Sequence, residues 1–494
     1  MTTSPQRNNT LRIIVSAAGV ACALALIWLA VRPDTTTEAF NALADEHATR
    51  AWERPTPTPA GWEASPGSAA VDYRRAVERC VEPSALPDGW RVSIRQTILG
   101  VPEDQRFTPP PERREAASTC EQLGAASDDP VTPYLDEPTC RWLVACQGSV
   151  DLVLTGSRRE NARSPWWIWD PRNEDLGPLP STAYLPLLDA LIIDAGRLGA
   201  QGDRQGQLDR LAAAARMGQD LGRGSFLLGV MVGHAHTGLA LDHLQALVRD
   251  DALSEVELER LDDELRYLDR SGAHPAASLE AEFLTMLPNV ARDPELRAPP
   301  ASRGFDLQVR HNLVQRLLLK STVDDVGGLF LQVIEVARTE PELRQRVALY
   351  TAAYAKINAS LNPMTRQLGS SSLDNYDVKM VASHAQINLL RWAVAARLHH
   401  RRRGAWPTSA DDLQQGGALP DDPLMSGPFR LDLKEGAVTI ASRAPEDPTL
   451  QPYLRSPSDA ASLTVTLLHP PAPPAAPSDP ERLPRFQTGP TIER

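Results

Sequence analysis

The chain has 494 residues, a formal net charge of -12, 42% hydrophobic residues and only 5% aromatic residues. This hydrophobic content is sufficient for a folded core and excludes a wholly disordered protein. The acidic balance argues against nucleic-acid binding, which needs a basic surface. A chain of this length is typical of two or three domains, and the low aromatic content favours a helical core of Leu, Ala and Val. We therefore expect a mainly α protein.

The N-terminus carries a hydrophobic segment that predicts a transmembrane helix. Residues 13–31 form an uncharged apolar run, and a helix of this length spans about 30 Å, the thickness of a bilayer core. Arg7 and Arg12 precede the run, and Asp34 follows it. Because positive charge stays on the cytoplasmic side, we expect residues 1–12 in the cytoplasm. The bulk of the chain would then be extracytoplasmic, in the periplasm or at the cell surface.

Two other interpretations of this segment stay open. A signal peptidase could cleave after the small residues Ala23 and Ala25, and a lipoprotein would be cut before Cys22. In both cases the apolar run continues past the cleavage point, which is unusual for a processed signal. We therefore favour an uncleaved signal anchor.

Prolines and cysteines characterise the next part of the chain. Residues 32–66 contain several prolines among Thr and Ala, which predicts a stiff linker. Residues 67–181 are expected to form short helices and loops, and they contain four cysteines: Cys80, Cys120, Cys140 and Cys146. An even number of cysteines in an oxidising compartment predicts two disulfide bonds, with three connectivities open.

The spacing of the cysteines argues against the connectivity that joins Cys140 to Cys146. Cys140 and Cys146 lie six residues apart in a stretch of helical character, so they would face different sides of one helix. We therefore favour a bond from each of them to Cys80 or Cys120. Four buried thiols are the alternative. The chain has no CxxC pair, so we expect no zinc site.

Residues 182–403 carry the strongest helical pattern, with apolar residues recurring at i, i+3 and i+4. The segment 254–257 has the sequence of a capping box, which marks a helix start. A helix beginning near Ser225 is apolar around its first two turns and is predicted to be central and buried. A long helix over 376–403 should end with Gly404 as its C-cap. We expect an antiparallel helical bundle or a short α-solenoid.

Beyond the long helix the pattern changes to β structure. Stretches 429–433 and 437–442 flank a turn sequence that contains Gly, which predicts a β-hairpin. Stretch 462–468 is a candidate third strand. Residues 404–468 are therefore expected to form a small antiparallel sheet, and the Pro-rich residues 469–494 a disordered tail.

Three motifs mark this C-terminal region: Arg403-Gly404-Ala405-Trp406-Pro407, Leu419-Pro420-Asp421-Asp422-Pro423 and Gly427-Pro428-Phe429. Their order resembles the C-terminal region of the major pseudopilins of type II secretion, and the same tail closes a group of membrane-anchored helical proteins of bacteria. The resemblance implies a long helix that leads into a small antiparallel sheet. The chain departs from pseudopilins because it has no prepilin-peptidase site, no Glu inside the apolar run and no calcium-binding acidic run in the tail.

Four residues are candidates for catalysis, and no residues are candidates for binding a cofactor or metal. His236 and His243 share a helix face but lie about 10 Å apart along the axis, too far for one metal ion. Glu280 or Glu282 of a later helix could act with one of them as an acid–base pair. We favour the alternative that these polar residues close the end of a buried helix. No P-loop, SxxK, HExxH, GxSxG or GxGxxG motif is present.

A basic run, His399-His400-Arg401-Arg402-Arg403, ends the long helix. It could bind an anion or a lipid head group, but positive charge is also favoured at a helix C-terminus by the helix dipole. We favour the second interpretation, because it needs nothing beyond the helix itself.

Together these features predict a membrane-anchored, extracytoplasmic helical scaffold or binding protein with a protein partner in the cell envelope. One alternative is an envelope hydrolase, which requires the histidine and glutamate candidates to meet in one pocket. Another is an accessory protein of a secretion or pilus-like system.

Overall fold

The computed structural model describes residues 35–49, 65–80, 137–162, 181–272, 275–292, 313–360, 373–414, 418–434, 436–454 and 463–468. The predicted anchor (13–31), Cys120 and the C-terminal tail (469–494) lie outside the described residues. Within the described ranges, no helix is both long enough and apolar enough to cross a bilayer.

The described chain is mainly helical and ends in a small antiparallel sheet, which confirms these two parts of the predicted fold class. The helices are α2 (Thr35–Thr49), α3 (Ala69–Arg79), α6 (Glu137–Gly156), α7 (Leu185–Ala200), α8 (Arg204–Gly222), α9 (Leu227–Arg249), α10 (Glu255–Ser271), α11 (Pro275–Arg292), α12 (Leu313–Thr339), α13 (Leu343–Asn358), α15 (Leu373–Arg403) and α16 (Ala410–Gln414). The strands are β1 (Ser65–Ser68), β2 (Arg159–Asn161), β3 (Arg430–Lys434), β4 (Ala437–Ala441) and β5 (Thr464–Leu467).

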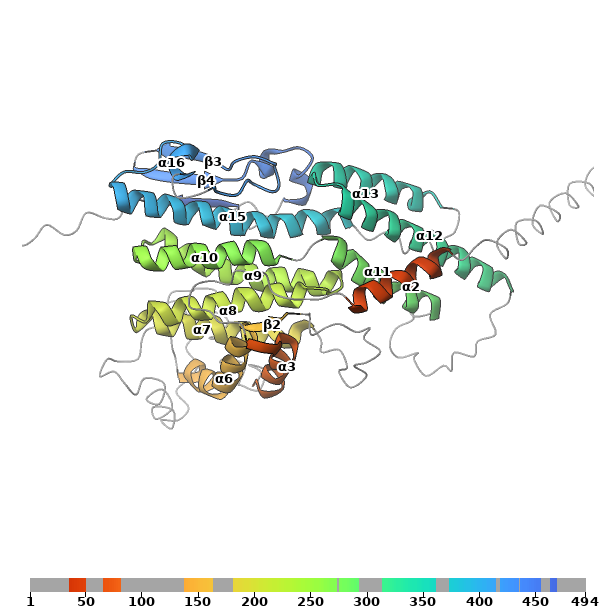
Figure 1. Cartoon of the computed structure of the whole chain (residues 1–494), viewed down its shortest axis with the longest axis horizontal. Coiled ribbons are helices and arrows are strands. Elements are labelled where there is room, and N and C mark those ends of the chain that lie inside the picture. Colours follow the sequence, from red (N-terminus) through yellow and green to blue (C-terminus); the bar gives the residue numbers. More distant parts are fainter. Residues whose placement is uncertain are drawn as a thin grey trace, which may run out of the picture.

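The long helices lie in layers along one axis of the molecule. Figure 1 shows α7 and α8, then α9 and α10, then α15, with β3 and β4 on the far side of α15. Helices α3 and α6 lie below α7 and α8, and α2 and α11–α13 gather at one end. One hydrophobic core runs from Tyr73 of α3 through Leu191 and Leu390 to Ile440 of β4. The expected boundaries at 181 and 404 therefore do not separate independent cores.

The expected linker over 32–66 needs correction in its first half, which forms α2. Leu43 and Ala44 of this helix are buried, and the ring of Phe40 meets Phe283 of α11 edge-on, with 5.7 Å between centroids. These three residues follow the i, i+3, i+4 spacing of an apolar helix face. The prolines that suggested a stiff linker lie outside the helix, so this face is free to pack.

Glycines bring α8 and α9 into close contact. A Cβ atom added to Gly233 would lie 2.4 Å from the carbonyl oxygen of Gly218 and 2.9 Å from the backbone nitrogen of Gly222. A Cβ atom on Gly218 would lie 2.7 Å from the Gly233 carbonyl oxygen. Only hydrogen side chains fit between the two backbones, so these glycines set the spacing of the helices.

The start of α9 differs from the expected one. The helix begins at Leu227, and the Oγ of Ser225 has no partner among the described residues. Glu282 of α11 instead accepts a hydrogen bond from the Leu227 N–H at 3.0 Å, so a carboxylate from another helix satisfies this N-terminus. Leu228 and Met231 are 54% and 48% exposed, so the first turns of α9 are buried on one side only.

The predicted ends of α10 and α15 are confirmed. The Ser254 N–H donates to Glu257 Oε2 at 2.6 Å, and the Glu257 N–H donates to Ser254 Oγ at 3.3 Å, which is the reciprocal capping box. Gly404 has a φ of 70° and donates its N–H to the His400 carbonyl at 2.8 Å. This left-handed C-cap turns the chain from α15 toward the sheet.

The sheet has the order β3-β4-β5 with antiparallel pairing, in which Leu431 lies opposite Ile440. The loop before β3 is closed by Asp422, whose N–H donates to the Gly427 carbonyl at 2.7 Å. The buried Asp422 carboxylate accepts from the Ser442 hydroxyl at 2.6 Å. The Asp-Pro motif therefore closes the loop through hydrogen bonds within the protein.

Arg397 of α15 fastens the sheet to the bundle. Its guanidinium group donates to the carbonyls of Val248 and Arg249 at the end of α9, at 3.2 and 2.7 Å. It also donates to the Leu468 carbonyl after β5, at 3.1 Å. The same group lies over the ring of Trp406, 5.1 Å from its centroid. One buried cation thus joins α9, α15 and the end of the sheet.

Candidate functional site

The histidine and glutamate candidates do not meet in the structure. Glu280 accepts two hydrogen bonds from an arginine of α12, at 2.7 and 3.1 Å. Glu282 accepts the bond from Leu227 at the start of α9. His236 lies nine residues further along α9, about 13 Å along the axis, and His243 lies about 10 Å beyond it. This geometry gives no support to an acid–base pair formed from these residues.

The two histidines are also poorly suited to proton transfer. Burial lowers the pKa of His236 to about 4, and it lowers the pKa of His243 as well. Both ring nitrogens of His236 are buried without a hydrogen-bond partner among the described residues. Near neutral pH these imidazoles are therefore uncharged. In the part of the chain that the structure describes, no three His, Cys, Asp or Glu side chains are arranged to hold a metal ion.

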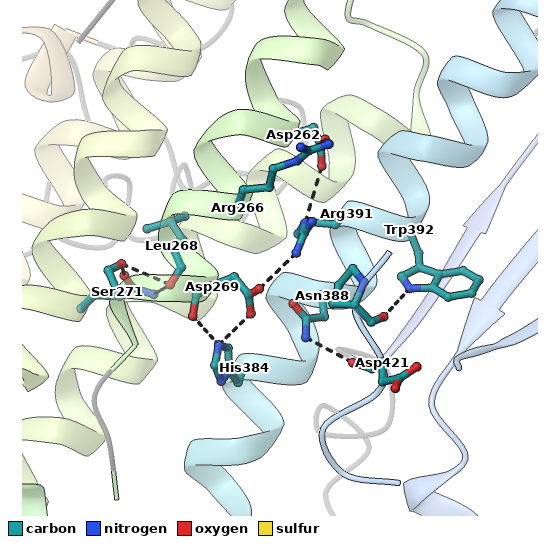
Figure 2. A network of polar contacts seen from close by, with 12 residues as sticks. Asp262, Arg266, Leu268, Asp269, Ser271, His384, Asn388, Arg391, Trp392 and Asp421 are labelled. Carbon is teal, nitrogen blue, oxygen red and sulfur yellow. Dashed lines mark hydrogen bonds and ion pairs between the residues drawn. The ribbon is translucent and has the colours of Figure 1, made fainter. Parts of the chain in front are cut away.

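A polar network joins α10 to α15 (Figure 2). Arg391 donates from Nη1 to Asp269 Oδ2 at 3.1 Å, and its Nε lies 3.6 Å from Asp262 Oδ1. His384 Nε2 lies 2.8 Å from Asp269 Oδ1 and 2.7 Å from the Asp269 carbonyl oxygen. Arg266 donates to Asp262 at 2.8 Å. The two aspartates are seven residues apart and so share one face of α10.

The network raises the pKa of its histidine. Burial lowers the pKa of His384, but the hydrogen bonds and charge of Asp269 outweigh burial and raise it above its ordinary value. The neighbouring Arg391 side chain is only 8% exposed. The carboxylate of Asp269 therefore contacts both Arg391 and His384, which bind α15 to α10.

Other side chains of α15 bind the loop before the sheet, as Figure 2 shows. Trp392 donates from Nε1 to the Pro420 carbonyl at 2.8 Å, and Asn388 donates to the Asp421 carbonyl at 3.3 Å. Helix α15 is thus fixed on one side to α10 and on another to the C-terminal loop.

Further along the same helices lies a cleft of about 550 Å³ between α10, α15 and the loop around α16. Its volume falls within the range of ligand-binding pockets. On each helix the lining residues follow helical spacing, so each helix presents one continuous face. The lining residues are Glu259, Asp262, Asp263, Arg266, Ala395, Leu398, His399, Arg402, Arg403, Asp412, Leu413 and Leu419.

The basic run at the end of α15 is largely neutralised within the protein. Arg402 forms ion pairs with Glu255 and Glu259 of α10. Arg401 forms one with Asp251 at 2.8 Å. Because the acidic first turns of α10 lie beside this run, its arginines hold the helices together. The arrangement favours a structural role over the alternative of an anion or lipid site.

One charged group of the cleft has no partner among the described residues: the exposed carboxylate of Asp263. Ala395, Leu398 and Leu413 line the same cleft with apolar surface. The cleft therefore presents a free negative charge beside apolar side chains. The sequence did not indicate this cleft, because its walls come from three segments that lie far apart in the chain.

The cysteines form no disulfide bond among the described residues. The Sγ atoms of Cys80 and Cys146 lie 3.4 Å apart, whereas a disulfide bond is about 2.05 Å long. Cys140 is buried elsewhere on α6.

Comparison with known proteins finds no family model that matches the chain, and neither a curated protein nor a solved structure matches it. The similarity of the C-terminal region to pseudopilins therefore stays a prediction from the sequence motifs. The function has to be argued from the geometry of the chain itself.

Proposed function

We propose that the protein is a membrane-anchored, extracytoplasmic scaffold that binds a protein partner of the cell envelope through the cleft between α10, α15 and α16. The observation that carries this proposal is the cleft itself, which combines about 550 Å³ of space, a mainly charged lining with a few apolar side chains, and the free Asp263 carboxylate. The anchor and the orientation rest on the apolar run 13–31 and the arginines before it.

The chemistry of the cleft indicates the kind of partner segment. Its lining holds four carboxylates and three arginines, in addition to His399. Arg402 and Arg266 are committed to Glu259 and Asp262. A partner segment that presents Lys or Arg beside an apolar side chain would pair with Asp263 and bury apolar surface on Leu398 and Leu413. Charge pairing gives such an interface its specificity, and apolar burial contributes most of its affinity.

Several contacts connect the walls of the cleft and support a preformed site. Arg391 and His384 join α15 to α10 on one side of the cleft, and Arg402 joins the same helices on the other side. Trp392 holds the loop that carries Leu419. A preformed site loses less conformational entropy on binding, which favours recognition by docking.

This proposal can be tested with the full-length chain, expressed in cells of its native host. A photo-crosslinking amino acid is placed at position 399, which lines the cleft. We expect one protein to be crosslinked at position 399 and no protein at position 335, an exposed position on α12. Asp263→Arg should reduce the yield at least tenfold, whereas the matched charge reversal Glu335→Arg should leave it unchanged.

Two outcomes would contradict the proposal: equal crosslinking at the two positions, or a yield that Asp263→Arg does not alter. If the crosslinked protein is a component of a secretion machine, the chain is an accessory protein of that machine.

A further inference from the structure

Two cysteines from distant parts of the sequence lie side by side. Cys80 is the C-cap residue of α3, and Cys146 lies on α6. Their Sγ atoms are 3.4 Å apart, although the residues are 66 positions apart in the sequence. Closing this gap to the length of a disulfide bond requires a movement of only about 1.4 Å.

Contacts that do not involve sulfur hold the two helices in this position. A Cβ atom on Gly156 of α6 would lie 2.8 Å from the ring of Tyr73 of α3, so the helices touch directly. Arg159 of β2 binds Asp72 of α3 at 2.5 Å. The parallel pairing of β1 with β2 joins the start of α3 to the end of α6. The approach of the two thiols is thus set by the packing of the helices.

We propose that Cys80 and Cys146 form a disulfide bond once the chain is outside the cytoplasm, which rests on the proposed extracytoplasmic placement. Both thiols lose a proton and together lose two electrons, and one S–S bond forms. The electrons reduce the disulfide of a thiol–disulfide oxidoreductase to a dithiol. Of the three connectivities open from the sequence, only the one that joins Cys120 to Cys140 is compatible with this bond.

Peptide mapping of the full-length chain tests the assignment. Cells are quenched in acid, thiols are blocked with N-ethylmaleimide, and the purified chain is digested without reduction. We expect a linked peptide pair that contains Cys80 and Cys146. In the Cys80→Ser variant, Cys146 should be alkylated instead. A link from either residue to Cys120 or Cys140, or alkylation of both thiols in the unaltered chain, overturns the proposal.

A second measurement separates a wrong pairing from a wrong compartment. Lys434 is exposed at the end of β3, so a membrane-impermeant amine reagent labels it only where the sheet is extracytoplasmic. If Lys434 is labelled and the thiols are alkylated, the disulfide assignment fails and the placement stands. If Lys434 is not labelled and the thiols are alkylated, the extracytoplasmic placement fails and the redox-buffer experiment decides the pairing. In a glutathione redox buffer, the purified chain should form the Cys80–Cys146 link irrespective of compartment, and another link overturns the pairing.

Discussion

Replacing Gly233 with alanine tests the close packing of α8 against α9. Alanine is favoured over glycine in a helix by about 1 kcal/mol, so propensity alone predicts a more stable protein. The new Cβ atom would lie 2.4 Å from the carbonyl oxygen of Gly218, whereas carbon–oxygen contacts are normally about 3.3–3.6 Å. Because the obstacle is backbone, the helices must separate by about 1 Å. Overpacking of this kind costs roughly 1–3 kcal/mol. We expect a cost of about 3 kcal/mol for Gly233→Ala, because backbone atoms cannot move aside as a side chain can.

We therefore expect Gly233→Ala to destabilise the protein by about 2 kcal/mol, the difference between the two effects. The midpoint of urea unfolding of the full-length chain, followed by circular dichroism at an unchanged slope, measures this change. The matched control is Gly148→Ala on α6, where a Cβ atom meets nothing within 4 Å. This control should stabilise by about 0.5–1 kcal/mol. A Gly233→Ala variant as stable as the unaltered chain would refute the proposed contact.

Three further predictions concern charged side chains. Arg216→Ala should lower the free energy of unfolding by about 3–5 kcal/mol, because Glu264 would stay buried without its cation. Urea unfolding measures the change in stability, and a loss below about 1 kcal/mol would contradict the prediction. The raised pKa of His384 means that its bond to Asp269 stabilises the fold below pH 6.5, and that this contribution disappears as the pH rises through the higher folded-state pKa. The stability difference between the unaltered chain and His384→Gln should therefore shrink from pH 6 to alkaline pH, and a constant difference would contradict the assignment. Arg397→Met should speed proteolysis within residues 404–468 while hydrogen exchange in α7 and α8 stays unchanged, because the lost bonds join α15 to the end of α9 and to the sheet and none reaches α7 or α8. An equal loss of exchange protection in α7 and α8 would contradict this prediction.

Local signals explain which elements could be predicted from the sequence. The capping box at Ser254 and the Gly404 C-cap each depend on residues within one turn, and both are confirmed. Helix α2 was missed because nearby prolines dominated the interpretation of residues 32–66, although Phe40, Leu43 and Ala44 carry a helical pattern. A short helix beside a Pro-rich segment can be predicted from the sequence only when its own apolar spacing is considered separately from the prolines that follow it.

The candidate site could not be predicted in the same way. Asp263 resembles any solvated carboxylate on a helix, and only the packing of α15 and the loop around α16 turns its surroundings into a cleft. The N-terminus of α9 shows the same limit, because the group that satisfies it, Glu282, comes from a different helix. Long-range contacts of this kind leave no periodic signal in the residues that make them.

The order of the cleft walls along the chain has a consequence for biogenesis. In the proposed orientation, the segments that follow the anchor would cross the membrane in chain order, with residues 259–266 first, residues 395–403 next and residues 412–419 last. The charged face of α10 therefore remains in water until the final wall has emerged. A partner that recognises the complete cleft would bind only chains whose synthesis has passed residue 419, so assembly of the complex would be timed by completion of the fold.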